Sequence, residues 1–172
     1  MYSSIHCWDG SHVGVVGTIM KSIWVTKSTG ISKPWGNEQA WSTGGSSRIK
    51  GKILYINKGH RTSLKYNQNK DETLFVLSGR LLLTHADEKF ESHKTFKSCY
   101  VEPGESINVQ SECPYRVKAL VDSVIVEIGF GGNGSSNSVR FHDDYGRHSS
   151  IEGEIVHLAQ GSESSITDVK DI

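Results

Sequence analysis

Short runs rich in Val, Ile, Leu, Tyr and Phe recur along the chain, and residues that favour turns separate them. Hydrophobic residues spaced three and four apart, which would mark one face of a helix, are hard to find. Many short apolar runs at this spacing are typical of an all-β sandwich or barrel. The runs lie at 13–20, 22–27, 52–57, 73–79, 80–85, 106–110, 115–120 and 123–130, with one more around Tyr100 and Val101. The pattern therefore predicts an all-β fold.

The residues between the runs predict particular turns. Ser78 and Gly79 separate two apolar runs and predict a tight hairpin, because glycine accepts a positive φ. Residues 102–105 read Glu-Pro-Gly-Glu, with proline and glycine in favoured turn positions. The Gly- and Ser-rich segment 129–138 predicts a flexible loop. Residues 148–172 are rich in serine and acidic side chains, and we expect the last ten to be a loosely held tail.

Composition narrows the class of protein. A chain of 172 residues suits one domain with an ample core. The formal net charge is zero, which gives no electrostatic reason to expect nucleic acid or an anionic membrane as a partner. Neither a membrane-spanning apolar run nor the pattern of a signal peptide is present. The three cysteines are odd in number and widely spaced, so we expect a soluble, cytoplasmic protein without a disulfide framework.

Residues 59–79 hold a set of positions with a regular spacing. They are Gly59, Lys65 after five residues, Asn67 after one, Glu72 after four and Gly79 after six. This spacing resembles the first cupin motif, in which the positions of Lys65 and Asn67 carry histidines. The second cupin motif would begin at Gly104, and its histidine would fall at Tyr115. The resemblance implies a cupin double-stranded β-helix, a jelly-roll barrel, over about residues 48–130.

Three segments resemble one subfamily of cupins, the C-terminal isomerase module of type II mannose-6-phosphate isomerase/mannose-1-phosphate guanylyltransferase. The segments are Lys33–Gly36 (Lys-Pro-Trp-Gly), Gly59–Leu64 and Ser138–Arg147, in the order and at about the spacing of that module. The resemblance spans residues 33–147, which we take as the barrel domain. Residues 1–32 would be an N-terminal extension of extra strands, with 13–20 and 22–27 as a hairpin, and 148–172 a short C-terminal extension.

The resemblance also implies a metal site that this chain has altered. In the family, a divalent metal bound by Gln, His, Glu and a second His assists proton transfer between C1 and C2 of the sugar phosphate. Those positions here are Lys65, Asn67, Glu72 and Tyr115. A lysine ammonium has three donors and no acceptor, and zinc requires about four N, S or O ligands. We therefore expect no metal cofactor, with Glu72 the one remaining ligand if a metal binds at all.

Several basic and aromatic residues have two interpretations. Arg61, Lys70 and Arg140 match basic positions of the family module and could bind the phosphate or carboxylate of a small sugar ligand. Alternatively, Arg61 braces a turn, Arg140 ties the last strand to an acidic neighbour such as Asp143, and Lys70 forms a solvated pair with Asp71 in a loop. Trp35 and Trp41 could stack on a sugar ring or pack against the barrel.

Two functions remain open from the sequence. The first is a mannose-6-phosphate isomerase-like enzyme of sugar-phosphate or polysaccharide metabolism, an aldose–ketose isomerase with weak or lost activity, in which Glu72 is the base and Lys65 or Tyr115 the acid. The second is a non-catalytic cupin, either a sugar or small-anion binding module or a structural subunit. In either case we expect a homodimer. We further predict that Lys65 pairs with Glu72 in place of the metal, and that Asn67 and Tyr115 complete the hydrogen bonds.

Overall fold

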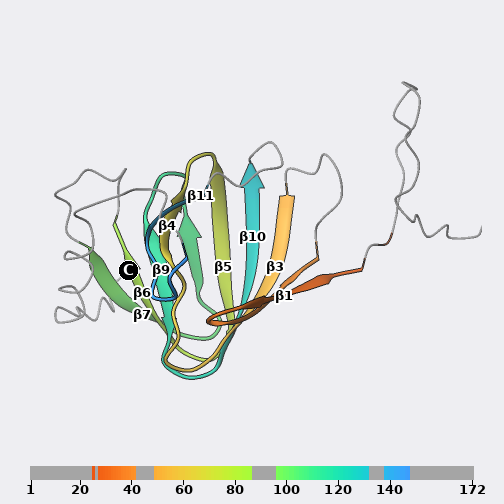
Figure 1. The fold of residues 1–172 in the computed structure, drawn as a ribbon, viewed down its shortest axis with the longest axis horizontal. Coiled ribbons are helices and arrows are strands. Elements are labelled where there is room, and N and C mark those ends of the chain that lie inside the picture. Colours follow the sequence, from red (N-terminus) through yellow and green to blue (C-terminus); the bar gives the residue numbers. More distant parts are fainter. Residues whose placement is uncertain (1–24, 26, 42–48, 87–95, 132–137, 148–172) are drawn as a thin grey trace, which may run out of the picture.

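The computed structural model describes residues 25, 27–41, 49–86, 96–131 and 138–147. These residues form two antiparallel sheets, as Figure 1 shows, and the predicted all-β fold is confirmed. The strands are β1 (Thr29–Lys33), β2 (Gly36–Ala40), β3 (Ile49–Ile56), β4 (Leu64–Asn67), β5 (Lys70–Ser78), β6 (Leu81–His85), β7 (Lys97–Val101), β8 (Ser106–Val109), β9 (Tyr115–Ala119), β10 (Ser123–Gly131) and β11 (Ser138–His142). Among the described residues, no helix is long and apolar enough to cross a bilayer.

The two sheets face each other as a barrel. The six-stranded sheet has the order β1-β2-β3-β10-β5-β8, and the five-stranded sheet has the order β11-β4-β9-β6-β7. In Figure 1, β3, β10 and β5 stand side by side on one side of the barrel and β9, β6 and β7 on the other. Because strands from distant parts of the chain are neighbours in both sheets, residues far apart in sequence meet in the interior.

The inward-facing residues of the central strands divide the interior into an apolar end and a charged end. In β5 and β10, every second residue is buried, as expected for strands with one face toward a core. Leu74 and Val76 of β5 and Ile125 of β10 face inward at one end, where they form the main core with residues of both sheets. The same inward positions carry Lys70 and Glu72 at the other end of β5. One end of the interior is therefore apolar and the other is charged.

The predicted hairpin at Ser78 and Gly79 is wrong. β5 pairs with β10 and β8, whereas β6 pairs with β7 and β9, so the two strands lie in different sheets. Gly79 has φ of 97°, and a Cβ there would lie 2.1 Å from Ser123 Oγ. The chain turns sharply but crosses between sheets, because the apolar faces of β5 and β6 both have to reach the shared core.

The predicted turn at 102–105 is confirmed. Gly104 has φ of 91°, and the Glu105 N–H donates to the Glu102 carbonyl over 3.1 Å. This is the arrangement in which proline precedes a glycine of positive φ. The turn also connects β7 of one sheet to β8 of the other.

Other boundaries differ from the sequence interpretation or fall outside the described residues. Residues 129–131 belong to β10 rather than to a loop, because Gly129 and Gly131 pair with Glu72 and Lys70 of β5. β1 begins at Thr29, so the six-stranded sheet contains residues from both sides of the boundary predicted at 32/33. The predicted hairpin of 13–20 with 22–27 and the tail after Arg147 lie outside the described residues.

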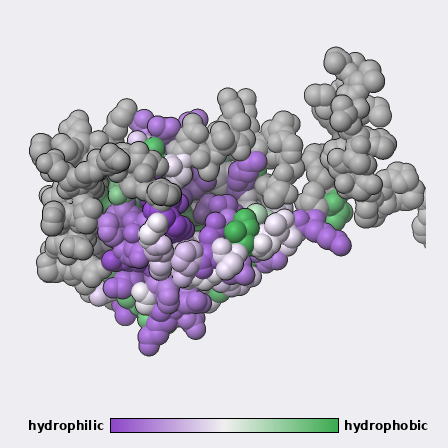
Figure 2. Space-filling model, viewed as in Figure 1, coloured by the Kyte–Doolittle hydropathy of each residue, from purple (hydrophilic) through white to green (hydrophobic). Residues whose placement is uncertain are grey.

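Both tryptophans of interest pack against the barrel. Trp35 is 5% exposed and belongs to the main core, which confirms burial. Trp41 is half-exposed and its ring covers Gly51, where a Cβ would lie 2.3 Å from the ring. Elsewhere, hydrophilic residues predominate on the described surface that Figure 2 shows.

Candidate functional site

Three of the four positions that correspond to metal ligands in the resembled family, Lys65, Glu72 and Tyr115, come together at the charged end of the interior. Lys65 and Tyr115 are paired in register between β4 and β9, and Glu72 faces them from β5. The Lys65 ammonium lies 3.7 Å from Glu72 Oε2, and the Tyr115 hydroxyl donates to the same oxygen. The predicted pairing of Lys65 with Glu72 is confirmed, as is the contribution of Tyr115.

Asn67 does not take the role predicted for it. The residue is 3% exposed, and neither atom of its side-chain amide has a hydrogen-bond partner within the described part of the chain. Its contact to the rest of the fold is through its backbone carbonyl, which accepts from the Glu112 N–H over 2.6 Å. Asn67 therefore lines the interior without joining the Glu72 cluster.

Lys70 is the cation closest to Glu72. Its ammonium contacts Glu72 Oε1 directly and lies 3.6 Å from Glu127 Oε1. Lys70 is 7% exposed, so the alternative of a solvated pair with Asp71 in a loop is wrong. Lys70 begins β5 and points inward, whereas Asp71 points outward, because side chains alternate along a strand. Gly129 leaves room for Lys70, since a Cβ there would lie 3.0 Å from Lys70 Cδ.

Glu127 is a member of the cluster that the sequence reasoning missed. It is 4% exposed and comes from the middle of β10. The Lys52 ammonium of β3 lies 4.0 Å from Glu127 Oε1 and 3.6 Å from Glu38 Oε1. The Lys33 ammonium of β1 lies 3.4 Å from Glu38 Oε2. The sequence did contain a signal for Glu127, which is the single charged residue within the apolar run 123–130. Glu127 is two residues after Ile125, so the two side chains point to the same, inner face of β10.

These residues form an alternating row that we call the charge ladder. Its members, in spatial order, are Lys65, Glu72, Lys70, Glu127, Lys52, Glu38 and Lys33. The row follows the neighbouring strands of the six-stranded sheet and ends on β4 of the other sheet. Burial of an unpaired charge costs several kcal/mol, and here each buried glutamate has a lysine on either side.

The ladder sets the protonation of its members. Burial alone would raise the pKa of Glu72, but Lys65, Lys70 and the Tyr115 hydroxyl outweigh it and hold this pKa well below its ordinary value. Burial would lower the pKa of Lys70, yet Glu72 and Glu127 raise it. Burial and the nearby Glu72 carboxylate raise the pKa of Tyr115 well above its ordinary value. Burial and Glu72 also raise the pKa of Glu127. At neutral pH the centre thus holds an ionised Glu72, a protonated Lys70 and a neutral Tyr115.

The residues present do not fit a divalent metal of the kind that the resembled family uses. Lys70 occupies Glu72 Oε1, and the Tyr115 hydroxyl and Lys65 approach Oε2. A lysine ammonium has no lone pair to offer a metal and repels it. Within the described ranges, no group of three or more His, Cys, Asp or Glu side chains is arranged to hold a metal ion. A metal bound at Glu72 would have to displace an ammonium group.

Arg61 and Arg140, predicted to bind substrate together with Lys70, have other partners. The two signature segments 59–64 and 138–147 bind each other. The Ser63 hydroxyl donates to Asp143 Oδ2 over 2.6 Å, and Arg140 Nε donates to Ser63 Oγ over 3.0 Å and lies 3.9 Å from Asp143. Arg61 donates to both carboxylate oxygens of Asp144. These contacts agree with the alternatives in which Arg140 ties the last strand to Asp143 and Arg61 braces a turn.

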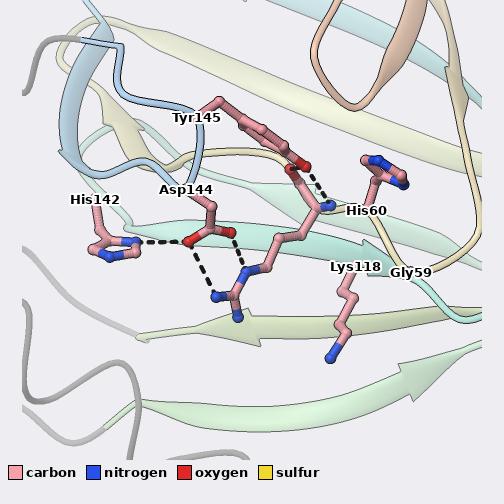
Figure 3. A pocket seen from close by; sticks show the side chains of 7 residues that line it. Gly59, His60, Lys118, His142, Asp144 and Tyr145 are labelled. Atoms are coloured by element: carbon pink, nitrogen blue, oxygen red, sulfur yellow. Dashed lines mark hydrogen bonds and ion pairs between the residues drawn. The ribbon is translucent and has the colours of Figure 1, made fainter.

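The pocket beside Arg61 lies on the outer face of the five-stranded sheet. Tyr115 and Val117 of β9 belong to the interior core, so Arg116 and Lys118, which alternate with them, face outward. Figure 3 shows His142 and Asp144 next to each other at one end of this pocket, with Lys118 and His60 farther along it. Arg61 is thus separated from Glu72 by the sheet itself.

Comparison with known proteins identifies the fold. No family model matches the chain, and no curated protein matches it. Among solved structures, the capsular polysaccharide assembling protein CapF from Staphylococcus aureus superposes with a TM-score of 0.54 at 12% identity, covering 67% of this chain and 34% of that one. Oxalate decarboxylase from Bacillus subtilis superposes with a TM-score of 0.53 at 14% identity, covering 70% of this chain and 33% of that one.

This chain therefore spans about a third of the length of the structures it resembles. At such low identity the likeness concerns the fold alone. The two antiparallel sheets and these structural neighbours lead to one conclusion: the chain has the jelly-roll barrel of the cupins.

Proposed function

We propose that this chain is a cupin of sugar-phosphate or polysaccharide metabolism that keeps the barrel of a mannose-6-phosphate isomerase-like module and works as a non-catalytic binding module. The observation that carries the proposal is the pair of ammonium groups, from Lys70 and Lys65, at the two oxygens of Glu72. Lys65 and Glu72 are two of the positions that correspond to metal ligands in the resembled family. The link to polysaccharides is supported by the three signature segments and by the name of the capsular polysaccharide assembling protein, which shares the fold.

The charge ladder is poorly suited to isomerisation. Moving a proton between C1 and C2 of a sugar creates an enediol-like anion, which a metal stabilises by several kcal/mol. A useful general base has a pKa near the working pH, whereas the pKa of Glu72 is held well below its ordinary value by Lys65 and Lys70, against the effect of burial. The pKa of Tyr115 is displaced in the opposite direction, by burial and by Glu72, so the phenol is a weak acid.

A metal-free isomerase is the second candidate. The observation in its favour is the hydrogen bond from the Tyr115 hydroxyl to Glu72, which connects an acid and a base across two strands from opposite sheets. In that case Glu72 would abstract the proton, and Tyr115 or Lys65 would supply one to the substrate oxygen. Both candidates take a small sugar phosphate or carboxylate as ligand.

Metal analysis and an activity assay separate these possibilities. Protein purified without added metal is expected to carry well under one equivalent of Zn, Mn, Fe or Ni. Its turnover of mannose 6-phosphate is expected below the usual enzyme range of roughly 1–10³ per second. One equivalent of metal that is lost in Glu72→Gln would contradict the proposal. Turnover within the usual range by metal-free protein, abolished in the same variant, would favour the isomerase instead.

A further inference from the structure

The outer pocket beside Arg61 lies apart from the charge ladder. It has a volume of about 610 Å³ and is open to solvent. Its lining comes from the loop before β4, from β9, from the end of β11 and from the turn after it, and comprises Gly59, His60, Arg61, Lys118, His142, Asp144 and Tyr145. Apart from Tyr145, five of these residues carry an ionisable side chain.

Cations outnumber carboxylates around the pocket. Arg61 and Lys118 line it, and Arg116 lies behind it with its Nη2 atom 3.8 Å from Asp144 Oδ1 and 3.3 Å from His142 Nδ1. Asp144 is the only carboxylate among the described lining residues. Burial would raise the pKa of Asp144, but the hydrogen bonds from Arg61 and the charge of Arg116 lower it, so this carboxylate stays ionised and bound to the arginines. Three permanent positive charges thus surround one negative charge.

Arg61 is held in place before any ligand arrives. Asp144 fixes the Arg61 guanidinium through Nε and Nη2, the latter over 3.0 Å. Tyr145 fixes the backbone of the same residue, since its hydroxyl accepts from the Arg61 N–H over 3.2 Å and donates to the Arg61 carbonyl over 3.1 Å. The His60 ring lies nearly parallel to the Tyr145 ring, with 6.4 Å between centroids. A site whose donors are already ordered loses less entropy when it binds.

We propose that this outer pocket binds the phosphate group of a phosphorylated sugar, with Lys118 as the charged donor and Arg61 as a second cation beside it. A phosphate monoester carries up to two negative charges and three acceptor oxygens, which match an excess of cations and imidazole donors. Arg61 contributes its positive charge at the edge of the pocket, since Asp144 accepts from its Nε and Nη2, and the Lys118 ammonium adds a mobile point charge. The inference rests on the proposed function for the sugar-phosphate class, and it places the ligand outside the barrel rather than at Glu72.

Calorimetric titration at low ionic strength tests the site. The probes are inorganic phosphate, mannose 6-phosphate and unphosphorylated mannose. Wild-type protein is expected to bind both phosphates and not mannose, and added salt is expected to weaken binding because it screens exposed charges. If the protein binds inorganic phosphate but does not bind mannose 6-phosphate, the assignment to a sugar phosphate is overturned. Absence of phosphate binding at millimolar concentrations would overturn the site altogether.

Substitutions at Lys118 locate the binding. Lys118→Gln is expected to weaken phosphate binding about tenfold, the effect of one charge-assisted hydrogen bond. Lys118→Arg keeps the charge and is expected to stay close to wild type. The matched control Lys50→Gln removes a lysine from β3, on the other sheet, and is expected to bind normally. Equal weakening in Lys118→Gln and Lys50→Gln would show a net-charge effect and overturn the assignment.

Lys65→Gln distinguishes the outer pocket from the barrel interior. If phosphate binding is lost in Lys65→Gln and kept in Lys118→Gln, the ligand lies inside the barrel and the inference is wrong. Metal content and isomerase turnover, measured on the same preparations, decide the proposed function separately. A protein without metal or turnover that also fails to bind phosphate would refute the pocket and leave the non-catalytic assignment in place.

Discussion

At Glu72, the ammonium groups of Lys65 and Lys70 each lie beside one of the two carboxylate oxygens. Lys65 and Lys70 together carry two positive charges next to one carboxylate, and Glu127 balances the second. Glu72 is therefore not an uncompensated buried charge, which would cost several kcal/mol.

Lys70 contributes more to stability than Lys65. It is almost fully buried and contacts both Glu72 and Glu127, whereas the Lys65 side chain is 24% exposed and stands 3.7 Å from Glu72. Removal of one partner from a buried pair costs about 3–5 kcal/mol, and an exposed pair contributes about 1 kcal/mol or less. Lys70→Met is thus expected to lower the melting temperature by roughly 10 °C, and Lys65→Met by much less, in thermal unfolding followed by circular dichroism.

The double variant checks that the loss comes from the unpaired carboxylate. Lys70→Met combined with Glu72→Gln is expected to recover much of the stability, because neither charge remains without its partner. A double variant as unstable as the sum of its two single variants would show that Lys70 stabilises the barrel by packing alone.

Acid is expected to destabilise the protein partly through Glu72. Its pKa in the folded protein is lowered by Lys65 and Lys70 against the effect of burial, so the unfolded chain, with a glutamate pKa of about 4.3, takes up the proton first. This contribution is present above about pH 4.3 and is lost as the pH falls toward the folded pKa. Glu127 acts in the opposite direction, because burial and Glu72 raise its pKa and the folded state binds that proton more tightly.

The measurement compares melting temperatures between pH 6 and pH 3. Glu72→Gln is expected to show a smaller fall than wild type over this range, although its melting temperature at neutral pH is lower. Glu102→Gln, at a surface ion pair with Arg80, serves as the control and should keep the wild-type slope. Identical slopes for wild type and Glu72→Gln would mean that other groups, such as Asp143 and Asp144, account for the acid sensitivity.

At the scale of elements, apolar runs located the strands but not their partners. The runs 52–57, 106–110, 115–120 and 123–130 all became strands. The error at Ser78 and Gly79 arose because a tight turn fits a hairpin or a crossing between sheets equally well, and only the distant partners of β5 and β6 decide between them. Turn chemistry is local, whereas strand pairing depends on the whole fold.

The sequence predicted only those residues of the candidate site that the motif spacing and the family resemblance identify. The spacing of residues 59–79 brought Lys65, Glu72 and Tyr115 together correctly. Lys70 was interpreted as solvated because it stands next to Asp71, although it begins a strand that points it inward. Glu127 has no motif, and its role follows from a register with β3 and β5 that the sequence does not reveal.

Substitution of three glycines distinguishes the cost of backbone strain from the cost of close packing. Gly79 has φ of 97° and no room for a Cβ, Gly104 has φ of 91° with open space, and Gly30 has neither restriction. We expect Gly79→Ala to destabilise the protein by about 3 kcal/mol, as strain and overpacking add. Gly104→Ala should cost about 1 kcal/mol, and Gly30→Ala should be neutral or stabilise by up to about 1 kcal/mol. Urea unfolding measures all three.

The order of the three variants is the decisive result. If Gly79→Ala is as stable as Gly104→Ala, Ser123 moves aside to make room for the added Cβ. The chain between β5 and β6 would then be less tightly packed than the 2.1 Å from that Cβ to Ser123 Oγ indicates.

At the scale of the whole molecule, the outer face of the six-stranded sheet is unusually apolar. Tyr55, Phe75, Leu77, Ile128 and Phe130 are between 38% and 57% exposed there. They lie on the three adjacent strands β3, β10 and β5, at positions that alternate with the inward residues. Exposed apolar residues that gather on one surface usually mark an interaction site, whereas scattered ones do not.

We propose that a second copy of this chain covers that face. The six strands hold 40 residues, and at about 4.8 Å between strands and 3.3 Å per residue they cover roughly 600 Å², of the same order as the 800 Å² per partner of a standard interface. The net charge of zero means that two copies do not repel each other at long range. A two-fold axis through β10 would place the same apolar surface on both sides of the contact.

We therefore expect a homodimer in sedimentation velocity at micromolar concentrations, and Ile128→Lys should convert it to a monomer that still folds. The reason is that a charge buried in an apolar contact without a partner costs several kcal/mol, whereas the same side chain on a free surface changes stability little. Val121→Lys is the matched control, because Val121 is 44% exposed, like Ile128 at 45%, but lies in the turn between β9 and β10. A monomeric wild type, or equal dissociation in both variants, would show that this face does not hold a second copy.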